Sequence, residues 1–343
     1  MVYDIAIIGA GASGLMAASY LQNKKICIID SNKTIGAKIK ISGGSKCNIT
    51  NKYLSFKKYL GDEIRIQDTF KRFDNKALLS FLNNNGVFPK IDEKIVKGTY
   101  FCKSSSDVIT MFKKLTSKSD FYLEHKVEDV VFEDEQFIIT TDKRTFFAKN
   151  VIVASGGLSY PALGASGIGF EIAEKFGHTV NRLDPALVGF TVQKDQFWFK
   201  ELSGLSVDAK ITIDNKEVEG KMLFTHKGCS GPAILSASLY WKKGTISINF
   251  LPNKDSYLPK RFRQAIKETK NELKNYSFAP AGNFGYTKAE VTKGGVVLEE
   301  LDENFQSKYQ KGLFFIGEVV DVTGELGGYN FQWAFSSGYC SVN

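Results

Sequence analysis

Short apolar runs on either side of a helical pattern open the chain. Residues 3–8 are mostly apolar and β-branched, which is typical of a strand in a parallel sheet covered on both faces. Residues 12–23 carry apolar side chains at helical spacing, and residues 25–30 form a second apolar run that ends in an acidic residue. This order of strand, helix and strand predicts one βαβ unit.

A long polar segment follows this unit. Residues 36–51 are rich in glycine, serine and lysine, which predicts a loop that is too long for a simple connection. Such a loop is suited to binding a ligand. Two helices are expected after it, one capped by Asn75 and the other by Ser106.

Strand patterns dominate the middle of the chain. Residues 121–154 predict a β-meander that returns to the first sheet, and a short helix is expected at 167–177. Alternating apolar and polar positions recur between residues 187 and 250, with one helix at 233–241. Residues 258–275 predict a basic amphipathic helix that packs on its apolar side.

The end of the chain repeats the pattern of its beginning. A strand at 313–316 is followed by a helix that starts at Gly328. We therefore expect a discontinuous first domain, made of residues 1–186 and 297–343, with a β-rich domain of residues 187–296 inserted into it.

Composition describes an ordinary folded protein and leaves its partner open. Of 343 residues, 43% are hydrophobic and 24% are charged, and the net charge is +8, from 45 basic and 37 acidic residues. This excess permits a nucleic-acid partner without requiring one. Glycine or charge interrupts every apolar run and the chain starts without an export signal, so we expect a soluble, cytoplasmic protein without a membrane span.

The five cysteines lie far apart in the sequence and form no C-x-x-C pair. Their spacing argues against a disulfide framework, a dithiol redox centre and a zinc ribbon. We therefore expect reduced thiols, as in a cytoplasm, and no metal site.

A glycine fingerprint lies between the first predicted strand and helix. Gly9 permits a tight turn, Gly11 lets the backbone approach a pyrophosphate, and Gly14 lets the helix meet the strand. The helix N-terminus attracts phosphate charge, and Asp30, at the end of the second strand, can accept both ribose hydroxyls. This register predicts a dinucleotide site, although spacing alone does not separate FAD from NAD.

Three later segments add to this site. The polar loop 36–51 can lie along phosphates and beside a ring, and residues 154–157, directly after a strand, let the backbone pass close to a cofactor. A glycine and a glutamate at 317–318, with a helix N-terminus at 327–330, would stabilise negative charge on a reduced flavin. This arrangement favours a flavin as the resident cofactor.

These segments resemble the FAD-dependent oxidoreductase family that includes the aminoacetone-oxidase-like and BaiN-type flavoproteins, within the glutathione-reductase-type fold. The resemblance is carried by residues 9–14, 42–51, 223–232, 289–296 and 317–333. Three details are most similar to the YhiN-type branch, namely residues 100–102, 163–166 and 323–331. That branch is associated with the reduction of a uridine in 23S ribosomal RNA to dihydrouridine, using FAD and a reduced nicotinamide.

The resemblance implies an α/β fold, in which a discontinuous Rossmann-like FAD-binding domain holds an inserted β-rich, barrel-like domain and a reduced helical segment. It implies FAD as cofactor, NADH or NADPH as transient electron donor, and 23S ribosomal RNA as partner. The FAD-binding positions that it implies are Gly9, Ala10, Gly11, Ser13, Gly14, Asp30, Lys38, Ser42, Gly43, Gly44, Cys47, Asn48, Val127, Ala154, Ser155, Gly156, Gly317, Glu318, Gly328, Tyr329 and Asn330.

The chain departs from the family pattern in three places. Ser45 and Lys46 stand where glycine and arginine are usual, which keeps the charge but loses the fork of an arginine. Cys229 stands where an aliphatic residue is usual, and residues 250–285 form a shorter segment than the helical subdomain of the family.

Reduction of a uracil requires a hydride at C6, a donor for the charge that develops on O4, and an acid for C5. Cys102, Cys229 and His226 are the candidates for this acid. His226 and Cys229 lie in a glycine-rich loop, where we expect exposure, whereas Cys102 also fits a small core position. Tyr160 and Tyr329 are candidates either to stack on a substrate or to pack.

Two other functions stay open. An FAD-dependent oxidase or reductase of a small amine or ketone would use the same cofactor residues but needs a closed apolar pocket. A non-redox, flavin-containing RNA-binding protein would keep those residues without an accessible flavin.

Overall fold

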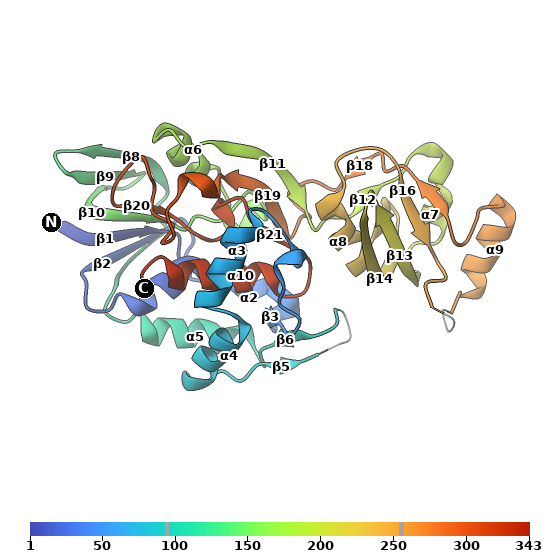
Figure 1. The fold of residues 1–343 in the computed structure, drawn as a ribbon, viewed down its shortest axis with the longest axis horizontal. Coiled ribbons are helices and arrows are strands. Elements are labelled where there is room, and N and C mark those ends of the chain that lie inside the picture. The colour runs from blue at the N-terminus through green and yellow to red at the C-terminus, as the bar shows by residue number, and fades with distance from the viewer. Residues whose placement is uncertain (93–95, 254–256) are drawn as a thin grey trace. The chain divides into compact units, whose positions relative to one another are not determined.

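A computed structural model describes residues 1–92, 96–253 and 257–343 of the chain (Figure 1). These residues form two compact units, and each is described by itself. Unit 1 comprises the chain as far as the gap at 93–95, then Lys97–Asp184 and Lys293–Asn343. Unit 2 comprises Val96 and the described residues of Pro185–Thr292.

A mixed sheet forms the centre of unit 1. Its strands lie in the order β7 (Asp120–Leu123), β2 (Ile26–Asp30), β1 (Val2–Ile8), β10 (Thr145–Val153), β9 (Gln136–Thr141) and β8 (Val127–Glu133), and β20 (Leu313–Phe315) pairs with β10. Its parallel part consists of the five strands β7, β2, β1, β10 and β20. Nearly all of β2 and the second half of β1 are buried, as expected for strands covered on both faces. The predicted βαβ unit and the α/β class are therefore confirmed.

Two helices of unit 1 pack side by side. α1 (Ala12–Tyr20) lies so close to α10 (Tyr329–Cys340) that a Cβ atom at Gly338 would come within 2.5 Å of the Ser13 carbonyl oxygen. On another side of α10, the ring of Phe335 stacks on Phe112, with 5.8 Å between the ring centroids. The helix predicted to follow the last strand is therefore almost wholly buried, which fixes its N-terminus beside the sheet.

The polar segment 36–51 is not a loop throughout. It forms α2 (Ala37–Ser45) and β3 (Asn48–Asn51), with non-helical backbone at positions 42–44 of α2. The buried side chain of Ile39 anchors α2, and the Ser105 hydroxyl donates a 2.9 Å hydrogen bond to the Lys40 carbonyl oxygen. These long-range contacts outweigh the local preference of glycine and serine for a loop.

The caps of two helices lie earlier than the sequence predicts. The Asp74 side chain accepts a hydrogen bond from the Ala77 amide, so Asn75 is inside α4 (Asn75–Asn84). In the same way, the Ser104 hydroxyl accepts from the Ser106 amide at the start of α5 (Ser105–Leu115). Each preceding side chain reaches an amide that the predicted cap cannot reach from within the helix.

The other elements of unit 1 are mostly short. They are β4 (Tyr59–Leu60), α3 (Glu63–Arg72), β5 (Lys90–Ile91), β6 (Thr99–Phe101), α6 (Ile168–Lys175), β11 (Val180–Ala186, which runs on into unit 2), β19 (Val291–Val296) and β21 (Thr323–Gly324). Among them, β3, β6 and β5 form a three-stranded antiparallel sheet.

Unit 2 is built on one antiparallel sheet in the order β17-β16-β13-β14-β15-β12-β18. Its elements are β12 (Phe190–Thr191), α7 (Trp198–Glu201), β13 (Ser206–Ile213), β14 (Lys216–Thr225), β15 (Gly228–Ser230), α8 (Pro232–Tyr240), β16 (Ile246–Asn249), α9 (Lys260–Thr269), β17 (Tyr276–Phe278) and β18 (Gly282–Asn283). Buried aromatic rings hold α9 on the sheet, with 5.7 Å between the centroids of Phe224 and Phe262. The basic helix thus packs on its apolar side.

None of the helices in the described residues is long and apolar enough to span a membrane.

A buried histidine in unit 1 has a consequence for stability. The His178 ring is buried, with Nε2 2.6 Å from the Ser307 hydroxyl and Nδ1 3.3 Å from a Glu300 carboxylate oxygen. Burial lowers the pKa of His178, although the Glu300 carboxylate opposes this shift. The unfolded chain therefore takes up a proton near pH 6.5 that the folded protein resists.

We expect acidification below about pH 6.5 to reduce stability through this histidine, because the unfolded state then binds more protons than the folded state. Melting temperatures measured between pH 5 and 8 should fall more steeply toward acid in the wild type than in His178→Gln. Parallel curves for the two proteins would contradict this role for His178.

Candidate functional site

The parallel strands of unit 1 end together at one edge of the sheet. Ile8 pairs with Ile29 of β2 and with Val153 of β10, and Val153 pairs with Phe315 of β20. The residues that follow these strands therefore lie at a common edge. Four predicted cofactor segments meet there, namely those beginning with Gly9, Asp30, Ala154 and Gly317. In α/β sheets, ligands bind at the carboxyl ends of the strands.

The three fingerprint glycines have different surroundings. A Cβ atom at Gly9 would lie 2.3 Å from the Ala154 carbonyl oxygen, and one at Gly14 would lie 2.1 Å from the Gly9 carbonyl oxygen. In contrast, a Cβ atom at Gly11, the N-cap residue just before α1, would meet nothing within 4 Å. Gly9 and Gly14 are thus needed for packing, whereas Gly11 leaves open space at the N-terminus of α1.

Asp30 is already held by its own loop. Its Oδ2 accepts a 2.7 Å hydrogen bond from the Ala10 amide, and its Oδ1 accepts from the amide and the side chain of Asn32 at 2.8 and 2.9 Å. A carboxylate has about four acceptor positions, so about one remains in the described structure. Asp30 can therefore accept one ribose hydroxyl without rearrangement, and not both as its type and position alone predict.

A lysine and a glutamate from distant segments form an ion pair near this edge. Lys38 Nζ in α2 lies 2.8 Å from Glu318 Oε2, which follows β20. A Cβ atom at Gly156 would lie 3.9 Å from that oxygen and 4.0 Å from that nitrogen. The structure therefore brings three predicted cofactor segments together, and Gly156 leaves room next to the ion pair.

β3 packs against the N-terminus of α10. A Cβ atom at Gly328, the N-cap residue just before α10, would lie 2.6 Å from the Thr50 carbonyl oxygen. The buried Asn51 side chain donates a 3.1 Å hydrogen bond to the Gly327 carbonyl oxygen. Asn51 lies at the end of the motif 42–51, and the sequence pattern does not predict this contact. The positive end of the α10 dipole is thus fixed beside β3.

One buried polar atom in β3 lacks a partner. Asn48 Oδ1 is buried and accepts no hydrogen bond from any residue that the structure describes. An unsatisfied buried carbonyl oxygen costs roughly 1–3 kcal/mol, so such groups call for an explanation. A ligand with an N–H donor would supply the missing bond.

Comparison with known proteins agrees with this geometry. The family described as HI0933-like protein Rossmann domain matches residues 3–343. The chain belongs to the HI0933-like family. A relative of this HI0933-like protein, the ribosomal RNA dihydrouridine synthase of Escherichia coli K12, is 34% identical over 388 aligned residues, covering 98% of this chain and 96% of that protein. The protein of the same name from Haemophilus influenzae is 34% identical over 394 residues, covering 98% and 97%.

Other proteins similar to this HI0933-like chain are named for a bile acid, a ketosteroid or fumarate. The 3-dehydro-bile acid delta(4,6)-reductase of Clostridium scindens is 27% identical over 98% of this chain and 97% of that protein. The solved structure of a 3-ketosteroid-delta4-(5alpha)-dehydrogenase from Rhodococcus jostii has a TM-score of 0.55 at 11% identity, covering 99% of this chain and 97% of that one. E. coli quinol fumarate reductase FrdA also has a TM-score of 0.55, at 15% identity, covering 99% and 69%. These two solved structures share the fold of the HI0933-like chain.

The HI0933-like chain is an FAD-dependent oxidoreductase with a Rossmann-type FAD-binding fold. The residues present fit this cofactor. Gly11 leaves open space at a helix N-terminus suited to a pyrophosphate, and Gly156 leaves room beside the Lys38–Glu318 ion pair. The buried Asn48 Oδ1 can accept a hydrogen bond from an N–H group of the flavin ring.

Left-handed backbone recurs from the last residues of α2 to the residue before β3 in the HI0933-like chain. Gly43 and Gly44 have φ values of 55° and 64°, and Ser45 and Cys47, which are not glycines, have 70° and 55°. Such residues cost roughly 1–2 kcal/mol each and cluster at ligand sites, where the surrounding structure holds them in place. The strain at Ser45 falls at a position for which the sequence resemblance implies a glycine.

We expect Ser45→Val to lower the free energy of unfolding by about 1–2 kcal/mol, because a β-branched residue resists a positive φ. Ser45→Gly should leave it unchanged or raise it by up to about 1 kcal/mol, because glycine accepts this backbone but loses more entropy on folding. Urea unfolding of the two variants and the wild type tests this order. Equal stability of the valine and glycine variants would show that the loop relaxes in solution.

Several predicted cofactor residues have packing roles. Tyr329 is buried, and its ring packs at right angles to that of Tyr59 with 5.7 Å between the centroids. Asn330 forms hydrogen bonds in both directions with the backbone of Gly324, each 2.8 Å long. Ser13 is buried against Gly317, where a Cβ atom would come within 2.4 Å of its hydroxyl. These residues pack against the segments that form the site.

Three other predicted positions lie next to the site. Ser42 Oγ donates a 2.9 Å hydrogen bond to the Ile39 carbonyl oxygen at the kink of α2. A Cβ atom at Gly169 would lie 2.1 Å from Ser155 Oγ, so this hydroxyl packs against α6. Val127 is buried at the start of β8, two residues after His125, whose amide donates to the Asp30 carbonyl oxygen at 3.0 Å. Their contacts with FAD stay predictions.

The three candidates for the acid differ in exposure. Cys102 is buried after β6, and a hydrogen bond with Cys47 together with burial raises the pKa of Cys102 far above its usual range. His226, in unit 2, is exposed in the turn between β14 and β15. The catalytic roles of all three candidates stay predictions, and the structure places one in unit 1 and two in unit 2.

The expected exposure of Cys229 is wrong. Its strand β15 pairs on both sides, opposite Phe190 of β12 and Phe224 of β14, so Cys229 belongs to the core of unit 2. Complete burial raises the pKa of the Cys229 thiol far above its usual range. The glycines around it predicted a loop, but they serve close contacts between strands. A Cβ atom at Gly228 would lie 2.2 Å from the Phe190 carbonyl oxygen.

One acid in the last glycine-rich motif has contacts that its sequence pattern does not predict. Asp321 accepts a 2.7 Å hydrogen bond from the side chain of Asn181 in β11. Burial raises the pKa of Asp321 above its usual value, against the opposing effect of this hydrogen bond. An aspartate of this kind holds its proton to higher pH than an exposed one. Asp321 lies between Glu318 and Glu325 in the sequence, and this polar neighbourhood does not predict burial.

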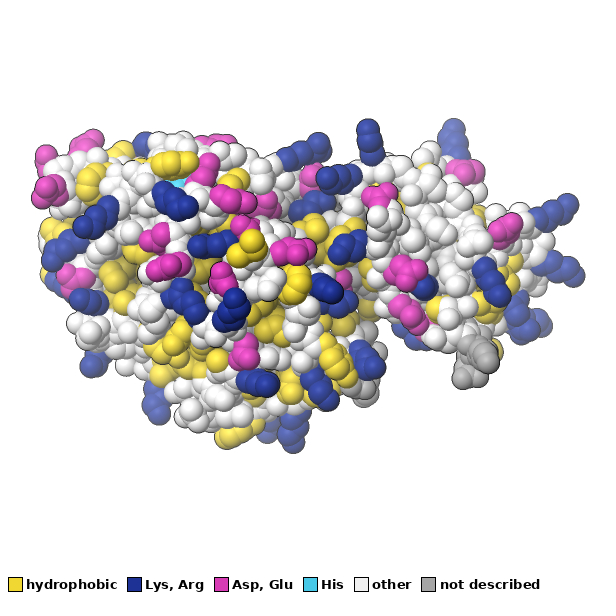
Figure 2. Space-filling model, viewed as in Figure 1, with side chains coloured by type: hydrophobic (Ala, Val, Ile, Leu, Met, Phe, Trp, Pro, Cys, Tyr) yellow, Lys and Arg dark blue, Asp and Glu magenta, His cyan; other side chains and the backbone are white. Residues whose placement is uncertain are grey.

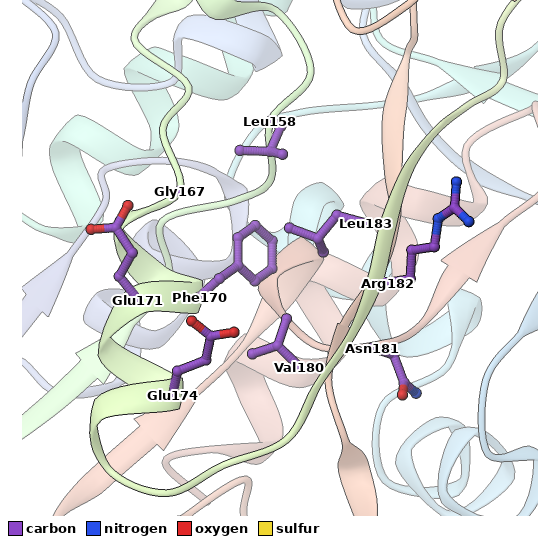
Figure 3. A pocket seen from close by; sticks show the side chains of 9 residues that line it. All are labelled: Leu158, Gly167, Phe170, Glu171, Glu174, Val180, Asn181, Arg182 and Leu183. Atoms are coloured by element: carbon purple, nitrogen blue, oxygen red, sulfur yellow. The ribbon is translucent and has the colours of Figure 1, made fainter.

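A separate pocket of about 450 Å³ lies between α6 and β11 in unit 1 (Figure 3). Figure 3 shows the side chains of Leu158, Phe170 and Leu183 grouped together, with those of Glu171 and Glu174 on the α6 side. None of the residues predicted for the cofactor or for catalysis lines this pocket. It is therefore distinct from the cluster at the strand ends.

Proposed function

We propose that this HI0933-like oxidoreductase reduces a uridine in 23S ribosomal RNA to dihydrouridine, with FAD as cofactor and NADH or NADPH as electron donor. One observation carries the proposal: two relatives named ribosomal RNA dihydrouridine synthase are 34% identical to the chain over nearly the full length of both partners. The net charge of +8 agrees with an RNA partner. A ribosomal RNA substrate also agrees with a cytoplasmic location.

The bound FAD supplies the hydride that uracil accepts at C6. The residues of the chain hold the cofactor and complete the reduction. Gly11 leaves the N-terminus of α1 open for a pyrophosphate, and Asp30 keeps about one acceptor position for a ribose hydroxyl. The N-terminus of α10 contributes positive charge that stabilises negative charge developing nearby, and Lys38 is held in place by its ion pair with Glu318.

The second half of the reduction is a proton at uracil C5. A buried thiol whose pKa is far above its usual range holds its proton but gives it up reluctantly, which disfavours Cys102 and Cys229. His226 is exposed and is therefore our first candidate for the proton donor. With the hydride at C6 and this proton at C5, the double bond of uracil becomes single and the nicotinamide is oxidised.

The test is dihydrouridine content along 23S ribosomal RNA, mapped by chemical labelling and primer extension in cells with and without the gene. The proposal expects one position to lose dihydrouridine in the deletion strain. A plasmid carrying the wild-type gene should restore it, whereas one carrying Gly11→Ala should not. Unchanged RNA would refute the proposal.

Unchanged RNA would favour a small-molecule FAD reductase or oxidase. The observation in favour of this second candidate is the relative named 3-dehydro-bile acid delta(4,6)-reductase, at 27% identity over 98% of the chain. Oxidation of NADH or NADPH by the purified protein in the presence of steroid ketones and amines would then identify the substrate class.

A further inference from the structure

An exposed tyrosine in unit 1 stands between two lysines. Tyr53 follows β3 and is 47% exposed. Lys52 Nζ and Lys97 Nζ each lie 5.7 Å from the centroid of its ring. Both lysines are exposed, and neither forms an ion pair with a residue in the ranges 1–92, 96–253 and 257–343. An aromatic face and two available cations are thus presented together.

The backbone beneath this tyrosine is held firmly. The Lys52 amide donates a 2.8 Å hydrogen bond to the Gly98 carbonyl oxygen, and the Tyr53 amide donates a 2.9 Å bond to Asn51 Oδ1. The Tyr329 hydroxyl donates to the Tyr53 carbonyl oxygen at 3.3 Å. A ring on a fixed backbone loses little conformational entropy when a ligand stacks on it, so the site is preorganised.

One buried amide connects the two lysine segments with the cofactor site. Asn51 Nδ2 donates 3.1 Å hydrogen bonds to the carbonyl oxygens of Lys97 and Gly327, while Asn51 Oδ1 holds the Tyr53 amide. Gly327 lies directly before the N-terminus of α10. The exposed tyrosine is therefore anchored beside the end of the cofactor site that α10 forms.

The ring also needs a glycine next to it. Gly98 has a φ of +75°, and a Cβ atom there would lie 2.6 Å from the ring of Tyr53. Any other residue at 98 would displace the ring and strain the backbone. The tyrosine is thus seated in a particular place between the lysines.

The surroundings are basic. Residues 36–61 contain six lysines and neither aspartate nor glutamate. Figure 2 shows lysine and arginine side chains beside hydrophobic ones over the part of unit 1 that holds β3, β5 and β6. Two of the six lysines, Lys38 and Lys58, are neutralised by ion pairs with glutamates. The remaining charge attracts a polyanion.

We propose that Tyr53, Lys52 and Lys97 form a platform on which one unpaired nucleotide of the RNA substrate stacks, with its base on the Tyr53 ring and its phosphates on the two lysines. Single-stranded RNA is recognised in this way, by aromatic stacking combined with cations along the backbone. This proposal depends on the proposed function, and it names the residues that bind RNA next to the flavin site.

The test measures the affinity of the FAD-loaded protein for a labelled fragment of 23S ribosomal RNA containing the modified position, by fluorescence anisotropy at several salt concentrations. Tyr53→Ala should weaken binding by about 5- to 150-fold, the usual loss for one stacked base. Tyr53→Phe keeps the stacking face and should bind as tightly as the wild type.

The lysines have their own readout and control. In the double variant Lys52→Gln/Lys97→Gln, the slope of log affinity against log salt should fall by about 1.4, because each phosphate contact on a single strand contributes about 0.7. The matched control is Lys126→Gln/Lys143→Gln, two exposed lysines near the β8–β9–β10 part of the sheet. That control should keep the wild-type slope.

Flavin content and the rate of flavin bleaching by NADH or NADPH should be unchanged in all these variants. If the wild type modifies the RNA and Tyr53→Ala binds it equally well, the platform is overturned while the proposed function stands. A raised KM for NADH or NADPH with unchanged RNA affinity would also overturn it, by assigning the platform to the electron donor. If the wild type neither binds nor modifies the RNA, both proposals fail.

Discussion

Gly11→Ala should give a folded protein that does not retain its flavin. A Cβ atom at this position would meet nothing within 4 Å, and Gly11 has an ordinary φ of −87°, so alanine fits the ligand-free fold without strain. The same methyl group would occupy the space in which backbone amides of α1 approach a pyrophosphate. Losing one hydrogen bond to a charged phosphate costs roughly 1.5–3 kcal/mol, or about a 10- to 150-fold loss of FAD affinity.

The measurement is the ratio of flavin to protein absorbance after reconstitution, followed by titration of the stripped protein with FAD. Gly282→Ala in unit 2 is the control, because its Cβ would meet only the Thr191 hydroxyl, at an ordinary 3.6 Å. We expect the control to bind FAD as the wild type does. Normal FAD affinity of Gly11→Ala would contradict the location of the pyrophosphate at the start of α1.

Gly14→Ala, the same chemical change three residues later, should instead destabilise the fold. Its Cβ atom would lie 2.1 Å from the Gly9 carbonyl oxygen and 3.2 Å from side-chain atoms of Ala154 and Ile7. Gly9 cannot move away easily, because its amide donates a 2.8 Å hydrogen bond to the Ile29 carbonyl oxygen. Relief therefore requires a shift of α1 from the sheet, at a cost of about 3 kcal/mol or more.

Urea unfolding with and without FAD tests the second variant. Gly14→Ala should unfold at a lower urea concentration in both conditions, whereas Gly11→Ala should differ from the wild type only when FAD is present. If Gly14→Ala unfolds at the wild-type midpoint, the contact between α1 and β1 is less tight than described.

Local pattern sufficed where an element depends on its own residues. The order of apolar run, helical pattern and apolar run in residues 3–30 predicts β1, α1 and β2. Buried parallel strands must be apolar throughout, and the glycine fingerprint must lie between strand and helix. The local pattern fails where contacts between residues far apart in the sequence determine whether an element forms. α2 forms in a segment dense in glycine and serine because Ile39 is buried and Ser105 bonds the Lys40 carbonyl oxygen. No local pattern contains that information.

The candidate site likewise has features that local sequence predicts and features that depend on distant contacts. Sequence predicts that the segments after β1, β2, β10 and β20 meet, since each directly follows a parallel strand. It does not predict which side chains pair across them. The Lys38–Glu318 bond joins residues 280 positions apart, and the bond from Asn51 to Gly327 joins residues 276 positions apart. Such pairings depend on the whole fold.

The five cysteines, all buried as free thiols, make the native protein almost inert toward thiol reagents. Reaction with a chromogenic disulfide should therefore proceed only as fast as the chain opens, and its rate reports unfolding without any added probe. A cysteine introduced at an exposed position such as Lys126 would for the same reason be the single site that a maleimide dye labels. The fold thus provides a background free of reactive thiols on which spectroscopic labels can be placed one at a time.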